Sequence, residues 1–300
     1  MKIIVRGQGM LDFRVKTFLT VCETMNFTRA ADRLHVTQPA VSQHIRYLEK
    51  EYQVKLFSYQ GKKLTLTAAG EKLRQAMRQM QSDERLLKAE IKQADLPPVR
   101  FGVTMTIGEY ALARPLSRFL KDHPQSNVEV VYGNTQFLTK KLDEGDLDFA
   151  LVEGDPARGY ASLRYQSEDF IAVCSPDLAF AKEPDQIADL FDQRLLVREP
   201  GSGTRKILED SLGAQGRELS DFKQYVQVGN MQMITQLLLA NCGVSFLYQT
   251  AVSDLLKTGK LRKLNLRNFQ IRHDFTFIWE KSSLYADRHR QICEELKASR

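Results

Sequence analysis

Apolar side chains near the start of the chain recur at helical spacing. They follow the i, i+3, i+4, i+7 stripe of an amphipathic helix, at Val15, Phe18, Leu19 and Cys22. Thr28 is placed to cap a second, short helix that runs through Leu34. Thr37 fits the N-cap of a third helix and Pro39 its first turn, where a missing N–H costs nothing. Two helices joined by so short a turn predict a helix-turn-helix.

The next segment predicts a hairpin followed by one long helix. Gly61, Lys62 and Lys63 lie between two runs suited to short strands, which indicates a basic wing. Residues 68–94 contain no proline and a single glycine, and their apolar positions recur at roughly helical spacing, at Leu73, Ala76, Met77, Met80, Leu87 and Ile91. A small head domain cannot cover this stripe. A helix from a second copy is therefore the simplest expected partner.

After Pro97 and Pro98, short β-rich runs alternate with helical patterns. The strand-like runs cover residues 99–104, 128–133, 149–154, 170–175, 195–199, 225–228, 244–247 and 275–279. Helical patterns cover residues 108–120, 135–144, 204–212, 231–241 and 284–296. This alternation predicts a mainly parallel α/β fold. The length of the region favours two sub-domains, with a ligand cleft where their strands end.

The patterns divide the chain into three expected parts. They are a helix-turn-helix with a basic hairpin at 1–67, a linker helix at 68–96 and an α/β region at 97–300.

Composition narrows the class of protein. Of 300 residues, 43% are hydrophobic and 27% charged, and the mean hydropathy is −0.36. No segment approaches the ~18 apolar residues of a membrane span, and the N-terminus has no signal-peptide pattern. The four cysteines contain no Cys-x-x-Cys pair, which indicates free thiols in a reducing cytoplasm. We therefore expect a cytoplasmic globular protein.

The positive charge is concentrated at the N-terminal end. Residues 1–96 contain 17 Lys and Arg against 10 Asp and Glu, a net charge of +7. Residues 97–300 contain 26 against 27, a net charge of −1. A basic module joined to a near-neutral one suits a protein whose first part meets a polyanion. On charge alone, a merely solvated basic surface remains the alternative.

Four segments together resemble the signature of LysR-type transcriptional regulators. They are 27–34, the run from Thr37 to Glu49, the Leu56-Phe57 pair and the stretch from Leu64 to Gly70. The resemblance implies a winged helix-turn-helix at 1–67, a long dimerising linker helix at 68–96 and an effector domain like a periplasmic binding protein at 97–300. Within the effector domain, it implies sub-domain I at about 97–169 and 271–300 and sub-domain II at about 170–270. It also implies four partners: double-stranded DNA, a small-molecule effector, a second copy in a homodimer or homotetramer, and RNA polymerase.

Two features depart from the family pattern. An arginine usually follows the Leu-Phe pair by two positions, but here the sequence continues Ser58-Tyr59. A customary phosphate contact is therefore either missing or supplied by Lys62 and Lys63. Family members also tend to begin close to the first helix, so Met10 is a candidate native start and residues 1–9 a candidate extension.

The third predicted helix carries side chains that are suited to contacts with base edges in a DNA groove. Gln38, Ser42 and Gln43 can hydrogen-bond to base edges, whereas Arg46 and the wing lysines are suited to phosphates. The full candidate DNA interface is Thr28, Arg29, Thr37, Gln38, Pro39, Ser42, Gln43, Arg46, Lys62 and Lys63. Taken singly, each polar residue is as consistent with an ordinary solvated helix face.

Candidate effector contacts come from turns that follow strands and open helices. Unpaired N–H groups at helix starts favour anions and polar groups. The candidates are Thr104, Thr106, Asn134, Thr135, Arg198, Ser202, Thr204, Arg205 and Asn230. We expect a small polar or anionic effector, with an arginine available for a carboxylate or phosphate. Each turn is also consistent with plain helix capping.

The sequence lacks the common motifs of catalytic and metal-binding sites. The sequence has no G-x-S-x-G elbow and no H-E-x-x-H, and its five histidines lack paired metal spacing. We therefore expect no catalytic residues, no metal and no cofactor. The sequence predicts a DNA-binding transcriptional regulator controlled by a metabolite. The alternative is a small-molecule enzyme or solute-binding protein with an accessory basic domain.

Overall fold

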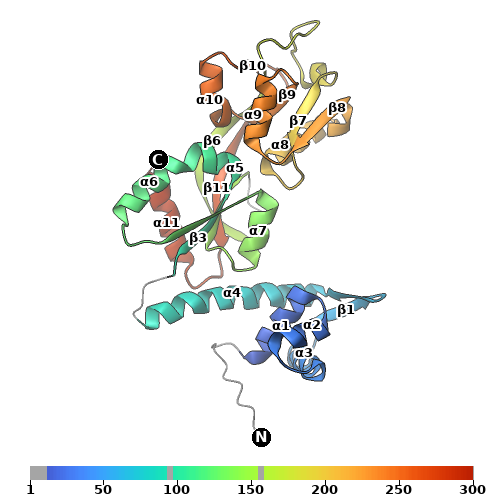
Figure 1. Cartoon of the computed structure of the whole chain (residues 1–300), viewed down its shortest axis with the longest axis vertical. Coiled ribbons are helices and arrows are strands. Elements are labelled where there is room, and N and C mark those ends of the chain that lie inside the picture. The colour runs from blue at the N-terminus through green and yellow to red at the C-terminus, as the bar shows by residue number, and fades with distance from the viewer. Residues whose placement is uncertain (1–11, 93–96, 155–158, 300) are drawn as a thin grey trace. The chain divides into compact units, whose positions relative to one another are not determined.

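The computed structural model describes residues 12–92, 97–154 and 159–299 (Figure 1). The chain forms two compact units. The first contains the residues up to Pro97 with the short segments 143–146 and 282–285, and the second contains the rest. The candidate extension at residues 1–9, with Met10, and the linker residues Asp95 and Leu96 lie outside the described residues.

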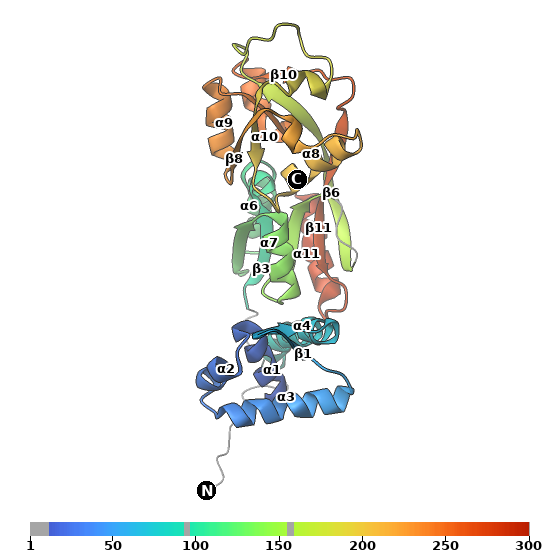
Figure 2. The ribbon, with the colours of Figure 1, turned by 90° about the vertical axis from the view of Figure 1, so that its right-hand side faces the viewer.

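The first unit is built from three helices, a hairpin and one long helix. Their bounds are α1 (Phe13–Thr24), α2 (Phe27–Leu34), α3 (Gln38–Tyr52), β1 (Phe57–Gln60), β2 (Lys63–Leu66) and α4 (Ala68–Ile91). Figure 2 shows α1 between α3 and α4. The helices enclose an apolar core that includes Phe18, Val21 and Ile45. The predicted helix-turn-helix and antiparallel wing are confirmed.

The start of α2 corrects the predicted cap. The side chain of Asn26, not Thr28, accepts hydrogen bonds from the backbone N–H groups of Thr28 and Arg29, at 2.9 and 3.0 Å. Asn26 takes this position because its backbone is extended while Phe27 already begins the helix. Thr37 does cap α3, where its hydroxyl accepts from the N–H of Ala40 at 3.4 Å.

The long helix α4 ends at Ile91, before the predicted residue 94. Part of its apolar stripe packs in the core of the head, and part is exposed to solvent. Met77 is buried in the core of the head and Leu73 packs against that core. Met80 and Ile91 are 50% and 69% exposed. The outward part of the stripe is therefore still an apolar surface in the single chain.

The second unit contains a nine-stranded sheet in the order β4-β3-β5-β11-β6-β9-β7-β8, with β10 paired to β6. The strands are β3 (Val99–Thr104), β4 (Val128–Gly133), β5 (Phe149–Glu153), β6 (Tyr160–Cys174), β7 (Arg194–Arg198), β8 (Gln224–Val228), β9 (Val244–Tyr248), β10 (Arg262–Leu264) and β11 (Ile271–Glu280). The main helices are α6 (Ala113–Asp122), α7 (Thr135–Asp143), α8 (Gly203–Gly213), α9 (Met231–Leu239), α10 (Gln249–Lys257) and α11 (Ala286–Ala298). Short 3₁₀ turns lie at Ile187–Leu190 and Leu219–Asp221. Figure 1 shows α6 and α11 on one side of the first half of the sheet and α7 on the other.

The expectation of a mainly parallel sheet is only partly right. Strands β3, β4 and β5 are parallel, as are β7, β8 and β9. The long strands β6 and β11 are antiparallel to each other and join the two halves. One carries the chain into sub-domain II and the other carries it back, so they must run in opposite directions. The first ten residues of β6 and the first four of β11 were not predicted, because they are polar rather than β-rich.

The helix predicted at 108–120 is interrupted. A short helical turn, α5 (Met105–Ile107), leads into a π-helical turn at Gly108–Leu112 before α6 begins. Gly108 is tightly placed, since a Cβ there would lie 2.4 Å from the Tyr132 ring. The periodicity of the sequence does not distinguish an α-helix from a π-turn, although such turns often mark functional sites. This one directly follows the predicted effector residues Thr104 and Thr106.

Gly70 offers a test of the packing between α4 and the hairpin. A Cβ at this position would lie 2.1 Å from the backbone carbonyl oxygen of Leu56, which cannot move aside cheaply. We predict that Gly70→Ala lowers the free energy of unfolding of the first unit by about 1–3 kcal/mol, as overpacking does. Thermal and urea unfolding of the full chain would measure the loss.

Gly213→Ala is the matched control. Gly213 also lies in a helix, but nothing stands within 4 Å of the added Cβ. Alanine there should leave stability unchanged or raise it by roughly 0.5–1 kcal/mol. Equal effects of the two substitutions would contradict the packing described for Gly70.

Candidate DNA-binding face and effector cleft

A groove of about 580 Å³ lies on the head, where α2, α3 and the hairpin meet. Five of the predicted DNA-contacting residues line it: Thr28, Gln38, Ser42, Arg46 and Lys62. The other five are exposed but do not line the groove: Arg29, Thr37, Pro39, Gln43 and Lys63. The fold thus gathers half of the candidates at one place and leaves the rest on the exposed head surface.

The polarity of α3 explains why its polar side chains face outward. Val41, Ile45 and Leu48 are buried on the inner face, and the spacing of three and four residues keeps them together. Gln38 and Arg46 are exposed on other faces of the helix. The Gln38 amide donates to the Ser42 hydroxyl at 2.9 Å, so these two side chains form one polar unit.

The groove also contains residues that were not predicted as DNA contacts, among them Tyr59 and Lys55. Tyr59, on β1, is 67% exposed although it is aromatic. Lys55 is held by an ion pair with Glu49 at 2.7 Å, and Glu49 also accepts from the N–H of Leu56 at 3.0 Å. Tyr59 occupies the position, two residues after Phe57, at which the family pattern usually has an arginine. An exposed aromatic beside a basic turn was the signal that could have identified it.

In the second unit, strand ends from both halves of the sheet meet at Glu153. This carboxylate ends β5 and is 5% exposed. It accepts from the Thr104 hydroxyl, at the end of β3, at 3.2 Å. It also accepts from the Thr204 hydroxyl, in the first turn of α8, at 2.7 Å. The predicted residues Thr104 and Thr204 therefore come together, but on a carboxylate that the sequence reasoning missed.

Both predicted arginines are already paired with carboxylates. Arg198 is 3% exposed and donates twice to Glu199, at 2.8 and 3.0 Å. Arg205 donates to Glu209 at 2.7 Å and to the carbonyl of Arg198 at 3.3 Å. Asn134, from the other half of the sheet, donates to Glu199 at 3.3 Å. The arginines lie beside the cleft with much of their charge balanced.

The two halves approach closely at Gly201 and Gly203. The N–H of Gln136 donates to the carbonyl of Gly201 at 3.2 Å. A Cβ on Gly203 would lie 2.9 Å from the Thr135 hydroxyl, so a larger residue does not fit there. The hydroxyls of Thr135 and Thr106 are buried, and neither has a hydrogen-bond partner within the described residues. Buried hydroxyls of this kind favour a polar ligand at the site.

A pocket of about 450 Å³ opens beside this contact. Its lining includes Thr135, Gln136, Glu153, Ser202 and His273. Of the predicted effector residues, Asn230 is exposed and its side chain accepts from the N–H of Met233 at 3.0 Å, which is ordinary capping of α9. The side chain of Asn134 also accepts from the N–H of Phe137 at 2.9 Å.

The surroundings of Glu153 are electrostatically unusual. Burial raises the pKa of the Tyr248 hydroxyl well above its ordinary value, and the charge of Glu153 adds to the rise. Burial also raises the pKa of the Glu109 carboxyl, while Arg198 opposes the change. Neutral Tyr248 is buried without a hydrogen-bond partner among the described residues. The site thus combines the buried side chain of Glu153 with several buried hydroxyls.

The described residues give little support for a reactive thiol or a metal site. Burial raises the pKa of the Cys174 thiol to about 11, and that of Cys22 to about 12. Both thiols are therefore protonated and poorly nucleophilic near neutral pH. Over the described ranges, no three His, Cys, Asp or Glu side chains are grouped as metal ligands. Within the same ranges, no helix is both long and apolar enough to cross a membrane.

Comparisons with solved structures agree with this fold. The chain is similar to ArgP from Mycobacterium tuberculosis, with a TM-score of 0.70, 20% identity and 96% of each chain covered. It is also similar to full-length LysG from Corynebacterium glutamicum with bound effector Arg. That TM-score is 0.68 at 18% identity, covering 96% of this chain and 98% of LysG.

Comparisons with family models and curated sequences agree with each other. A model described as the lysR family of bacterial regulatory helix-turn-helix proteins matches residues 14–71. A model described as the LysR substrate binding domain matches residues 93–299. The HTH-type transcriptional regulator CysL of Bacillus subtilis is 31% identical over 270 residues, which cover 88% of this chain and 89% of CysL. The chain therefore belongs to the family of LysR-type transcriptional regulators.

Proposed function

We propose that the groove of the head binds double-stranded DNA and that α3 enters the major groove. The observation that carries this proposal is the outward polar and basic lining built from α2, α3 and the wing. The N-terminal residues of a recognition helix contact base edges. In this chain those residues include Gln38 and Ser42.

Regulation rather than catalysis is the activity we propose. The curated relatives that match this chain are described as transcriptional regulators, which does not favour the enzyme or solute-binding alternative. A regulator that binds DNA must be in the same compartment as the chromosome, which supports a cytoplasmic location. RNA polymerase is a proposed further partner, implied by the family and not by a particular surface of this chain.

Within the DNA interface, we assign two roles. Gln38 can pair with an adenine edge in the major groove, while its hydrogen bond to Ser42 orients the amide. Lys62 is a point charge at the tip of the hairpin, where it can meet a phosphate of either strand. Base contacts specify sequence, whereas phosphate contacts strengthen binding to all DNA.

We predict that Gln38→Ala reduces discrimination between a selected site and random DNA by about 1–3 kcal/mol. Lys62→Ala should weaken binding to both DNAs similarly and reduce the slope of log affinity against log salt by about one unit. The selected site is one recovered from a random DNA pool with the wild-type chain. Binding titrations at several salt concentrations give both quantities.

Gln75→Ala is the control, because Gln75 is an exposed glutamine on α4, away from the groove. It should leave both affinities unchanged. Equal losses on both DNAs for Gln38→Ala would reject Gln38 as a base reader.

Self-association through α4 is the second part of the proposed function. Members of this family oligomerise. The exposed apolar side chains of α4, including Met80 and Ile91, are where a second copy would gain most from burial. A parallel or antiparallel helix pair needs such a stripe along one face. Leu73 is less suitable as a probe because it also packs against the head core.

We predict that Met80→Glu combined with Ile91→Glu shifts the full chain toward smaller species in sedimentation velocity at micromolar concentration. Charged side chains in the helix pair would be buried without partners, which is costly. Gln75→Glu adds a charge on an exposed part of α4 and should leave the assembly intact. An unchanged sedimentation coefficient for the double variant would place the interface elsewhere.

The third part concerns the effector. Glu153 is buried, both of its hydrogen bonds come from neutral hydroxyls, and no ion pair joins it within the described chain. A buried carboxylate without an opposite charge is costly. We infer that the effector is polar and presents a hydrogen-bond donor, such as an ammonium group, to Glu153. The anionic alternative would have to displace Glu199 or Glu209 from the arginines.

We predict that amines or amino acids raise the melting temperature of the full chain more than simple carboxylates or phosphates do. A ligand at 100 times its Kd adds about 2.7 kcal/mol of stability. Glu153→Gln, which keeps the shape of the side chain, should abolish the stabilisation by amines. Thermal-shift titration measures both effects.

Thr235→Val is the matched control for this site. Thr235 is a buried threonine in the same unit, but its hydroxyl donates within its own helix, to the carbonyl of Met231. It should leave ligand stabilisation intact. Stabilisation by anions alone, unchanged in Glu153→Gln, would contradict the inference about the donor group.

A further inference from the structure

One aromatic side chain of the head groove is left exposed by the fold. Tyr59, on β1, lines the groove and is 67% exposed, whereas Phe57, two residues before it, is 8% exposed. The turn of the hairpin follows directly, and its Lys62 also lines the groove. The ring of Tyr59 therefore contributes little to the core of the head, and its surface is available to a partner.

The register of the hairpin fixes the side to which Tyr59 points. Tyr59 lies opposite Leu64, and Ser58 lies opposite Thr65. Successive residues of a strand alternate between the two faces, while directly opposed residues share one. The hydroxyls of Ser58 and Thr65 share a hydrogen bond at 3.0 Å, which marks their common face. Tyr59 and Leu64 consequently share the other face, the one that lines the groove.

This face of the hairpin is anchored in the core of the head. The ring of Phe57 packs edge-on against those of Phe18 and Phe27, with ring centroids 5.6 and 5.9 Å apart. On the partner strand, Leu64 is 6% exposed. Both strands are therefore held close to the helices of the head. Because Tyr59 follows Phe57 on the same face, its backbone is fixed at the groove before DNA binds.

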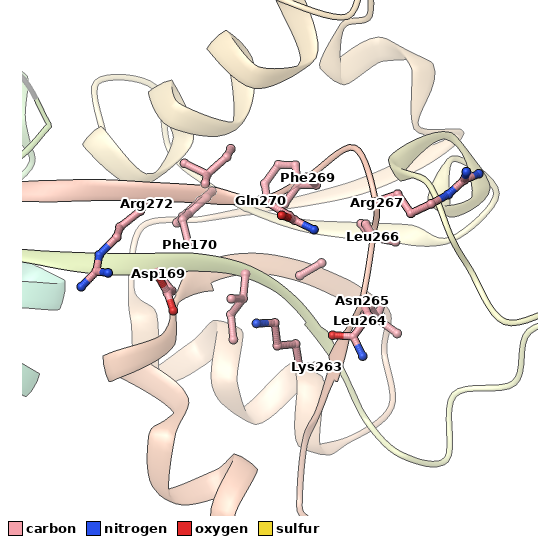
Figure 3. A pocket seen from close by; sticks show the side chains of 13 residues that line it. Asp169, Phe170, Lys263, Leu264, Asn265, Leu266, Arg267, Phe269, Gln270 and Arg272 are labelled. Carbon is pink, nitrogen blue, oxygen red and sulfur yellow. The ribbon is translucent and has the colours of Figure 1, made fainter.

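Convergence on one face distinguishes this groove from another hollow of the chain. A pocket of about 480 Å³ lies beside β6 and β10 in the second unit (Figure 3). Lys263 and Leu264 both line it, but they are successive residues of β10 and point to opposite faces of the sheet. In the head groove, by contrast, Phe57 and Tyr59 share a face, and Lys62 adds its charge from the adjoining turn.

A tyrosine at this position can contact the DNA backbone without adding charge. Its ring is an apolar surface that can lie against a deoxyribose, and its hydroxyl can donate a hydrogen bond to a phosphate oxygen. Tyrosine is among the side chains that contact phosphates in protein–DNA complexes. Only two side-chain torsions become fixed when it binds, so the entropic cost is small. Lys62, by comparison, is a point charge on a flexible stem.

We propose that Tyr59 is a phosphate-contacting residue of the DNA interface and contributes affinity that does not depend on charge. The contact rests on the proposed function of the groove. Gln38 contacts base edges there and Lys62 neutralises a phosphate, whereas Tyr59 binds a phosphate as a neutral donor. A phosphate contact acts on every DNA sequence, unlike a base contact. A neutral contact also displaces few counterions, so it leaves the salt dependence of binding nearly unchanged.

The test compares Tyr59→Phe with the wild-type full chain on the selected site and on random DNA. Loss of one hydrogen bond should weaken binding to both DNAs by the same factor, about three- to tenfold. The slope of log affinity against log salt should stay unchanged, because the variant has the same charge. Titrations at several salt concentrations give both quantities. The exposed ring should tolerate the substitution, which the melting temperature of the variant checks.

A second variant and a matched control complete the titrations. Tyr59→Arg replaces the neutral contact with a charged one, so it should make the slope steeper by about 0.9 on both DNAs. Tyr52→Phe is the control, because Tyr52 is an exposed tyrosine at the end of α3 that does not line the groove. This control should change neither affinity nor slope.

Phosphate ethylation interference on the selected site locates the contact. Ethylation of the phosphate that Tyr59 binds should weaken binding of the wild-type chain. The same ethylation should have less effect on Tyr59→Phe, while interference at the other phosphates persists. Tyr52→Phe should reproduce the wild-type pattern.

Three outcomes would overturn the proposal and leave the proposed function of the groove intact. One is an unchanged affinity of Tyr59→Phe for both DNAs. Another is a loss confined to the selected site, which would make Tyr59 a base-contacting residue. The third is a flatter salt slope in Tyr59→Phe, which would mean that the contact acts through charge. Failure of the wild-type chain to bind either DNA would instead contradict the proposed function itself.

Discussion

The antiparallel pairing of β6 with β11 is the constraint on which the second unit depends. These two strands belong to both halves of the sheet, and the remaining strands of each half build outward from them. The strand ends of the two halves consequently face each other, which brings Thr104 and Thr204 to the same carboxylate of Glu153. The same strand β6 also pairs with β10, beyond the end of its pairing with β11. The candidate effector cleft thus follows from one topological feature.

The head follows from a different and more local principle. Its helices are short and amphipathic, and each begins at a side-chain cap, at Asp12, Asn26 and Thr37. Burying Val41, Ile45 and Leu48 fixes the rotation of α3, and that rotation alone decides that Gln38 and Arg46 face outward. The polar face available to DNA is therefore a consequence of core packing. This local origin explains why the helix-turn-helix could be predicted so closely from periodicity.

Other features could not be predicted, for identifiable physical reasons. Asn26 rather than Thr28 caps α2, because both residue types suit the position and only the backbone conformation decides. The first part of β6 is polar and resembles a loop, since the pairing with β11 that makes it a strand is non-local. The position of Glu153 follows from the sequence, because it lies at the end of a predicted strand as Thr104 does. Its role does not, because the hydrogen bonds of its carboxylate join Thr104 and Thr204, which are distant in the sequence.

The central claim is that paired heads place α3 in successive major grooves of one DNA duplex. Methylation interference on DNA selected by the full chain tests it most directly, since purine N7 lies in the major groove and adenine N3 in the minor groove. The account predicts interference at N7 positions in two half-sites, with centres separated by about 10–10.5 base pairs or a multiple of that distance. Interference confined to minor-groove N3, or a single isolated contact region, would contradict it.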